Sequence, residues 1–130
     1  MYGLPPDLDG SSELRASGIT CPECAGCLAV RRERGGALFF ACRVGHTLSV
    51  DDLLTGKEEK IECDLWAIVR GLEELVALLE DLDAYGARHR HATVVDSPQD
   101  RIAQARDHAR RIREIIGEKQ PIDLASGGRA

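Results

Sequence analysis

Four residues with metal-binding side chains lie at the two ends of one short segment of the chain. Cys21 and Cys24 form a Cys-x2-Cys pair, and Cys42 and His46 form a Cys-x3-His pair farther along. Thiolate sulfur and imidazole nitrogen are donors that Zn²⁺ prefers, and structural zinc sites hold the ion in a tetrahedron of four such ligands. We therefore predict one structural zinc site, with one Zn²⁺ per chain, formed by Cys21, Cys24, Cys42 and His46.

The segment between the two pairs has the pattern of a β-hairpin. Leu28, Val30, Leu38 and Phe40 alternate with smaller or polar residues on either side of Gly35-Gly36. A hairpin this short buries too little apolar surface to offset the entropy that the chain loses on ordering. A structural zinc ion contributes on the order of 10 kcal/mol or more. We predict that residues 17–48 form a zinc-binding hairpin that depends on the metal.

A fifth candidate ligand lies close by, so alternatives stay open. Cys27 follows Cys24 by three residues, so it could replace His46 as a ligand; we favour Cys27 as a small buried apolar group at the start of a strand. A secreted disulfide framework is disfavoured by the five cysteines and the lack of an N-terminal apolar run. A thioredoxin-like redox pair is disfavoured because no strand-to-helix pattern surrounds Cys21.

Three stretches together resemble the small C-terminal extension of some bacterial chemotaxis protein-glutamate methylesterases. They are GITCPECAGCLAV, LFFACRVGHTLSVDDLL and the acidic segment through DLWAIVRGLEELVALLEDL. The resemblance implies a zinc-containing accessory module. Two features depart from it: Cys27 stands where an aliphatic residue is expected, and the esterase domain with its Ser, His and Asp is absent. The matching residues are Cys21, Pro22, Cys24, Gly26, Cys42, Arg43, Val44, Gly45, His46, Ser49, Leu65 and Trp66.

After His46 the pattern changes from strand to helix. Ser49 to Asp52 and Thr55 to Glu58 are both helix-start patterns, so the helix begins at Val50 with a weak point at Gly56, or begins afresh at Lys57, and runs to about Tyr85. Apolar residues then recur in an unbroken heptad seam, and Trp66, Val69 and Val76 add a second row. The seam comprises Ile61, Leu65, Ile68, Leu72, Leu75, Leu79 and Leu82.

A second helix is predicted after Ser97-Pro98, which supply an N-cap and a proline at the first helical position. Its apolar residues keep the same rhythm until Gly117: Ile102, Ala105, Ala109, Ile112 and Ile116. We expect this helix to fold back on the first as an antiparallel hairpin over residues 49–118. The first helix carries nine acidic and three basic residues over 57–85, and the second five basic and three acidic over 98–117, which favours the pairing.

The predicted fold is mostly α with a small β zinc knuckle: a zinc-ribbon-like hairpin followed by a long helical hairpin. Because the second helix is too short to cover the first, we expect homodimerisation through the Ile61–Leu82 seam into a four-helix bundle, or docking of a partner helix. The alternative is a monomer in which the zinc module folds onto the apolar residues of the first helix. Residues 1–16 are predicted to be a flexible arm, 119–130 a disordered tail, and Arg88–His91 part of a polar loop.

The composition points to an interaction module. Seventeen basic and twenty-two acidic residues give a net charge of −5, which disfavours a nucleic-acid partner. No membrane helix, small-molecule site or catalytic motif is recognised, and reduced cysteines fit a cytoplasmic protein. We predict a non-enzymatic, zinc-stabilised protein-protein interaction module of a chemotaxis-like signalling system. The alternative is a nucleic-acid-binding zinc ribbon that uses Arg31, Arg32, Arg34 and Arg43.

Overall fold

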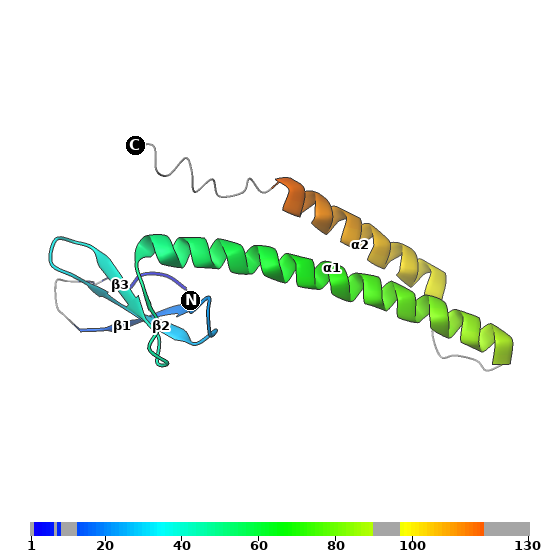
Figure 1. The fold of residues 1–130 in the computed structure, drawn as a ribbon, viewed down its shortest axis with the longest axis horizontal. Coiled ribbons are helices and arrows are strands. Elements are labelled where there is room, and N and C mark those ends of the chain that lie inside the picture. Colours follow the sequence, from blue (N-terminus) through cyan, green and yellow to red (C-terminus); the bar gives the residue numbers. More distant parts are fainter. Residues whose placement is uncertain (1, 7, 9–12, 90–96, 119–130) are drawn as a thin grey trace. The chain divides into compact units, whose positions relative to one another are not determined.

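A computed structural model of the chain describes residues 2–6, 8, 13–89 and 97–118. It contains a small antiparallel sheet followed by two helices, so the chain is mostly helical, as predicted (Figure 1). The predicted tail at 119–130 and residues 90–96 of the predicted loop lie outside the described residues. The chain divides into two compact units, Met1–Ile61 (the sheet unit) and Glu62–Ala130 (the helical unit).

Four strands make up the sheet in the order β1-β2-β3-β4, and each neighbouring pair is antiparallel. The predicted hairpin is confirmed, with Val30 opposite Phe40 and the tight turn at Gly35-Gly36, both of which have positive φ. The strands are β1 (Arg15–Thr20), β2 (Cys27–Arg32), β3 (Leu38–Ala41) and β4 (Thr47–Leu48). β1 and β4 were not predicted, because β1 is made mostly of small and polar residues and β4 has only two residues.

One face of this sheet carries the core of the sheet unit. Its buried residues come from β2, β3, β4, the start of α1 and the two cysteines beside them: Cys21, Leu28, Val30, Phe40, Cys42, Leu48 and Leu53. Ser17 is also buried, and its hydroxyl donates to the Leu28 carbonyl oxygen at 2.7 Å and accepts from the Ile19 N–H at 3.1 Å. This β1 serine therefore lies in the core with both hydrogen-bonding roles satisfied.

The described part of the N-terminal arm contacts the sheet unit. The Gly3 N–H donates to the Ser17 carbonyl oxygen at 3.1 Å, and Leu8 packs against the core. Because β1 begins at Arg15, the predicted arm boundary at residue 16 is two residues too late. The contact gives Leu8 apolar burial, and the flexibility of residues 1–16 stays a prediction.

Helix α1 (Val50–His89) begins at the first of the two predicted starts. The Asp52 N–H donates to the Ser49 hydroxyl at 3.1 Å and the Ser49 N–H donates to the Asp52 carboxylate at 3.3 Å, which is a reciprocal capping box. The helix runs through Gly56 without a break, so a new start at Lys57 and an end at Tyr85 are both wrong. Gly56 is required by close packing, because a Cβ there would lie 2.8 Å from Pro22 Cγ.

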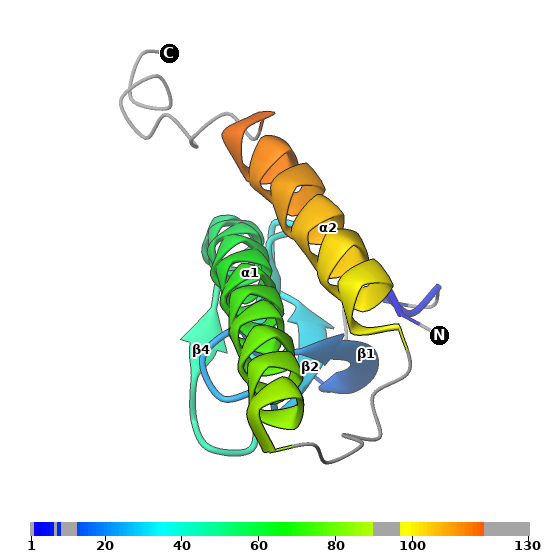
Figure 2. The same ribbon diagram turned by 90° about the vertical axis from the view of Figure 1, so that its right-hand side faces the viewer.

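In the helical unit, α2 (Pro98–Glu118) runs antiparallel to α1, as predicted, and both Figures 1 and 2 show it beside that helix. Three side-chain pairs join the helices, and their residue numbers fall along α1 as they rise along α2: Asp83 with Gln99, Glu80 with Arg106, and Glu73 with Arg113. Ile102, Ala105 and Ala109 are buried, and Ile112 and Ile116 are half-buried. The predicted apolar face of the second helix is thereby confirmed.

The seam predicted on α1 divides into two rows. Leu79 is buried and Leu65, Leu72 and Leu82 are half-buried, whereas Ile61, Ile68 and Leu75 are exposed. Val69 and Val76, assigned to a second row, are buried instead. The buried stripe is thus rotated away from the predicted seam, because both rows are apolar and periodicity alone does not say which one α2 covers.

Candidate metal centre

The first pair of predicted ligands lies in a tight turn after β1. The Ala25 N–H donates to the Cys21 carbonyl oxygen at 2.8 Å, and the Cys21 N–H donates to the Gly26 carbonyl oxygen at 2.7 Å. The Gly26 N–H also donates to Cys24 Sγ at 3.4 Å, and a Cβ on Gly26 would lie 3.2 Å from that sulfur. The turn therefore brings the backbone against the Cys24 sulfur and orients it toward Cys21.

A second tight turn holds the other pair between β3 and β4. The Cys42 N–H donates to the His46 carbonyl oxygen at 3.1 Å, and the Gly45 N–H donates to the Cys42 carbonyl oxygen at 3.2 Å. Gly45 has a φ of 103°, which a residue with a side chain rarely adopts. Gly45 therefore allows the tight turn just before His46.

The two turns bring all four predicted ligands together. Their donor atoms lie within 4.8 Å of one another, and this cluster could hold a metal ion. The Cys24 and Cys42 sulfurs are 3.7 Å apart, and His46 Nδ1 lies 3.4 Å from Cys42 Sγ and 3.8 Å from Cys21 Sγ. A tetrahedron with Zn²⁺ bond lengths separates two sulfurs by about 3.8 Å and a sulfur from a nitrogen by about 3.6 Å. The donor set thus fits such an ion.

The thiols themselves favour a cation between them. Burial raises the pKa of Cys42, but the backbone N–H groups of His46 and Val44 and the side chains of Cys24 and His46 lower it by more, to about 6. For Cys24, the Gly26 N–H lowers the pKa, whereas burial and the neighbouring Cys42 and Cys21 raise it by more, so its pKa lies above the ordinary thiol value. One thiolate therefore forms easily, and its negative charge disfavours a second thiolate beside it. A bound cation would offset the repulsion between the two negative charges.

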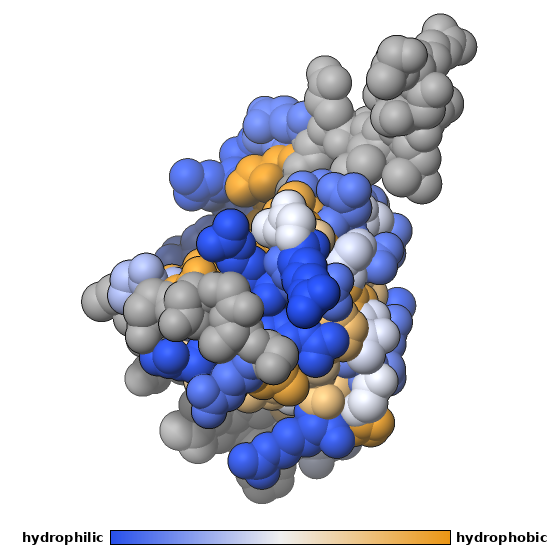
Figure 3. Space-filling view, turned by 90° about the vertical axis from the view of Figure 1, so that its left-hand side faces the viewer, coloured by the Kyte–Doolittle hydropathy of each residue, from blue (hydrophilic) through white to orange (hydrophobic). Residues whose placement is uncertain are grey.

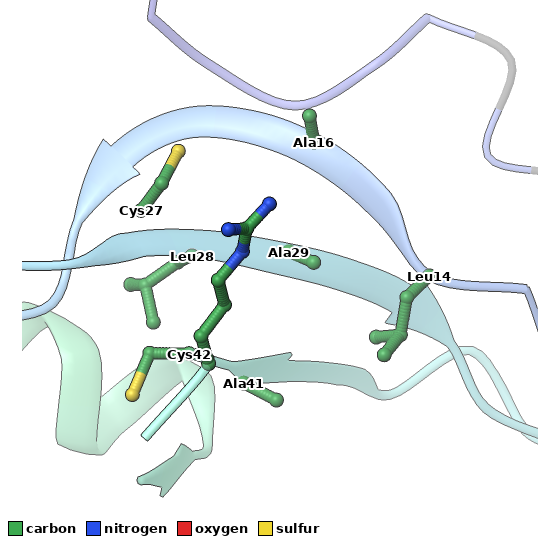
Figure 4. A pocket seen from close by; sticks show the side chains of 8 residues that line it. Leu14, Ala16, Cys27, Leu28, Ala29, Ala41 and Cys42 are labelled. Carbon is green, nitrogen blue, oxygen red and sulfur yellow. The ribbon is translucent and has the colours of Figure 1, made fainter. Parts of the chain in front are cut away.

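Cys27 is not part of the cluster. It is exposed, so the prediction that it is a small buried group is wrong. The strand alternation directs it to the face opposite the core, and in Figure 4 its sulfur points away from that of Cys42. There it lines an open hollow of about 370 Å³, whose lining includes Leu14, Ala16, Ala29, Ala41 and Arg43.

The four arginines of the alternative nucleic-acid interpretation are not gathered on one face. Arg31 and Arg32 are adjacent on β2 and therefore point to opposite sides of the sheet. Arg31 lies over the Phe39 ring at 4.3 Å from its centroid and is 3.5 Å from the Glu33 carboxylate.

On the face drawn in Figure 3, hydrophobic areas are small and are separated by hydrophilic side chains.

Sequence reasoning missed Glu23, the residue after Pro22 in the first turn. Its carboxylate oxygen Oε2 lies 3.1 Å from His46 Nε2, the ring nitrogen that faces away from the thiols. No spacing rule identifies such a residue, because it depends on how the two turns meet in space. An acidic residue between two cysteine ligands is the only indication that the sequence offers.

No match was found when the chain was compared with protein-family models, with curated proteins and with solved structures. The resemblance to the methylesterase extension therefore stays a prediction. Within the described residues, neither helix combines the length with the apolar composition that crossing a membrane demands.

Proposed function

We propose that this chain is a non-enzymatic protein-protein interaction module in which a structural Zn²⁺ stabilises the sheet unit and the helical unit binds another protein molecule. The observation that carries the proposal is the convergence of Cys21, Cys24, Cys42 and His46 within bonding reach of one ion. Three sulfurs and one imidazole nitrogen in this geometry are typical of structural zinc. Four protein donors complete the tetrahedron, so a structural role is favoured over Lewis-acid catalysis.

The proposed binding surface is a row of exposed apolar residues on the α1 part of the helical unit. Ile68 is 49%, Leu75 37%, Leu78 55% and Tyr85 47% exposed. They follow one another at helical spacing beside the stripe that packs on α2, so they form one continuous face, which we name the α1 outer row. Apolar rows of this kind bind a partner helix by burying their side chains.

For the occupant of the α1 outer row we propose a second copy of the chain. Two α1–α2 hairpins that meet through this row would form the predicted four-helix bundle. The row retains Ile68 and Leu75 from the predicted Ile61–Leu82 seam and adds Leu78 and Tyr85. The sequence resemblance supports a place in a bacterial chemotaxis-like signalling system, and the free thiols fit a reducing compartment such as the cytoplasm.

The decisive experiment combines metal analysis with solution mass on the purified full chain. We expect one zinc per chain and, as protein concentration rises, a shift from the mass of one chain to that of two. The double variant Ile68→Gln/Leu75→Gln should remain monomeric with its zinc retained. The matched control is Ile115→Gln on α2, which removes an equally exposed apolar residue outside the row.

A metal-free chain would overturn the zinc half of the proposal. A monomer at every concentration would overturn the proposed self-association. If the Ile68→Gln/Leu75→Gln variant still forms the dimer, the interface lies on another face.

A further inference from the structure

The two nitrogens of His46 face different partners. Nδ1 lies 3.4 Å from Cys42 Sγ and 3.8 Å from Cys21 Sγ, whereas Nε2 lies 3.1 Å from the Glu23 carboxylate oxygen Oε2. Only one nitrogen of a neutral imidazole carries a proton, and the other has the lone pair that binds a metal. The geometry therefore assigns the lone pair to Nδ1 and the proton to Nε2.

We infer that Glu23 is a positioning residue of the metal centre: it accepts a hydrogen bond from the His46 Nε2–H and so holds Nδ1 toward the ion. This inference rests on the zinc centre proposed above. Histidine ligands generally donate their second ring N–H to a carboxylate or carbonyl, which fixes the tautomer and the ring plane. Here the acceptor belongs to the same turn as Cys21 and Cys24, so one turn supplies two ligands and orients a third from the other turn.

The Glu23 contact acts through orientation rather than through simple charge attraction. The side chains of His46 and Glu23 are 34% and 59% exposed, and water screens the attraction between groups exposed to this degree. Orientation still matters there, because an imidazole free to rotate presents its lone pair to the ion only part of the time. A bound cation also polarises the Nε2–H and strengthens its hydrogen bond to the carboxylate.

Two variants separate orientation from charge. Glu23→Ala removes both the acceptor and the negative charge, whereas Glu23→Gln removes the charge and keeps an amide oxygen as acceptor. If Glu23 positions the ring, the Gln variant stays close to the wild type. If Glu23 acts only by charge, the Gln variant behaves like Ala. Glu33→Ala is the matched control, because Glu33 is an exposed acidic residue of the sheet unit paired with Arg31, away from the cluster.

The test is competition of the zinc-loaded full chain with a chromogenic chelator, together with ¹⁵N NMR of the His46 ring. Removing such a hydrogen-bond partner typically weakens metal affinity about 10–100-fold. We expect a loss in this range for Glu23→Ala, a smaller loss for Glu23→Gln and none for Glu33→Ala. The wild-type spectrum should show a metal-bound Nδ1 and a protonated Nε2, and in Glu23→Ala the Nε2 proton should exchange faster with water.

Three outcomes would overturn the inference: zinc bound through Nε2, wild-type affinity in Glu23→Ala, or an equal loss in Glu23→Gln and Glu23→Ala. A wild-type chain without zinc would overturn the metal centre together with this inference. One zinc per chain with unchanged affinity in Glu23→Ala would leave the centre intact and remove only the role of Glu23.

Discussion

Two cysteines of the sheet unit, Cys42 and Cys27, show how position decides the role of a thiol. Cys42 lies directly after β3, in the turn that joins the cluster, and is buried, whereas Cys27 is the first residue of β2 on the face opposite the core and is exposed. We expect Cys42→Ser to lose the metal and unfold the sheet unit, because the ion contributes on the order of 10 kcal/mol that this small core does not replace. Zinc content and the dispersion of the sheet amide resonances in NMR measure both effects.

Cys27→Ser is the control for Cys42→Ser, since it removes a thiol from the same sheet without touching the four donors. It should retain one zinc and an ordered sheet. Loss of zinc in Cys27→Ser, or ordered sheet resonances in metal-free Cys42→Ser, would contradict the assignment of ligands.

At this scale the sequence predicts the four residues that come together in the cluster but not the residues around them. The spacing of Cys21-Cys24 and Cys42-His46 predicted all four donors, because tight turns with two ligands each have few possible geometries. The contact between Glu23 and His46 joins residues from different turns, and the burial of Ser17 depends on a strand of weak pattern. Neither follows from local spacing.

At the scale of elements, the first turns of α1 belong to the sheet unit. Leu53 lies in its core, and Lys57 Nζ donates to the Thr20 hydroxyl at 2.7 Å. Gly56 had been predicted as a weak point of the helix, yet it is the position where α1 approaches Pro22 most closely. The local pattern identified the glycine, and only the tertiary contact explains it.

Gly56→Ala should therefore destabilise the sheet unit. The added Cβ would lie 2.8 Å from Pro22 Cγ, and the proline ring has little freedom to move away. Overpacking costs about 1–3 kcal/mol and alanine regains about 1 kcal/mol of helix propensity, so we expect a net loss of up to about 2 kcal/mol. Urea unfolding of the zinc-loaded chain, followed by sheet amide resonances, measures it.

Gly71→Ala is the contrasting change on the same helix. Nothing lies within 4 Å of a Cβ at Gly71, so alanine should stabilise the helical unit by about 0.5–1 kcal/mol. Equal effects of the two substitutions would show that the Pro22 contact is not what requires Gly56.

Truncation of two adjacent leucines of α1 should have effects of very different size. Leu79 is 3% exposed and packs with Val76, Ile102 and Ala105, whereas Leu78 is 55% exposed. Leu79→Ala should lower the unfolding free energy of the helical unit by about 2–5 kcal/mol. Leu78→Ala should change it by less than about 0.5 kcal/mol in dilute solution. Thermal unfolding followed by far-ultraviolet circular dichroism compares them, and similar losses would contradict the buried stripe described for α1.

For the molecule as a whole, the charge of α1 bears on the choice of partner. Residues 62–89 contain seven acidic and two basic residues. Three of the acidic side chains are paired with α2: Glu73 with Arg113, Glu80 with Arg106, and Asp83 with Gln99. Glu74 and Asp81 recur at heptad spacing along the border of the α1 outer row, so two copies that meet through this row would bring like charges together.

Self-association should therefore strengthen as salt screens this repulsion. Raising sodium chloride from 50 to 300 mM shortens the Debye length from about 14 to about 6 Å, and we expect tighter dimerisation in sedimentation equilibrium. Glu74→Gln/Asp81→Asn should give tighter dimers at low salt and a smaller salt effect. A partner helix rich in lysine and arginine would show the reverse, because screening weakens attraction between opposite charges. If salt weakens the dimer of this chain, opposite charges meet across the interface, and the two copies then associate through a face other than the α1 outer row.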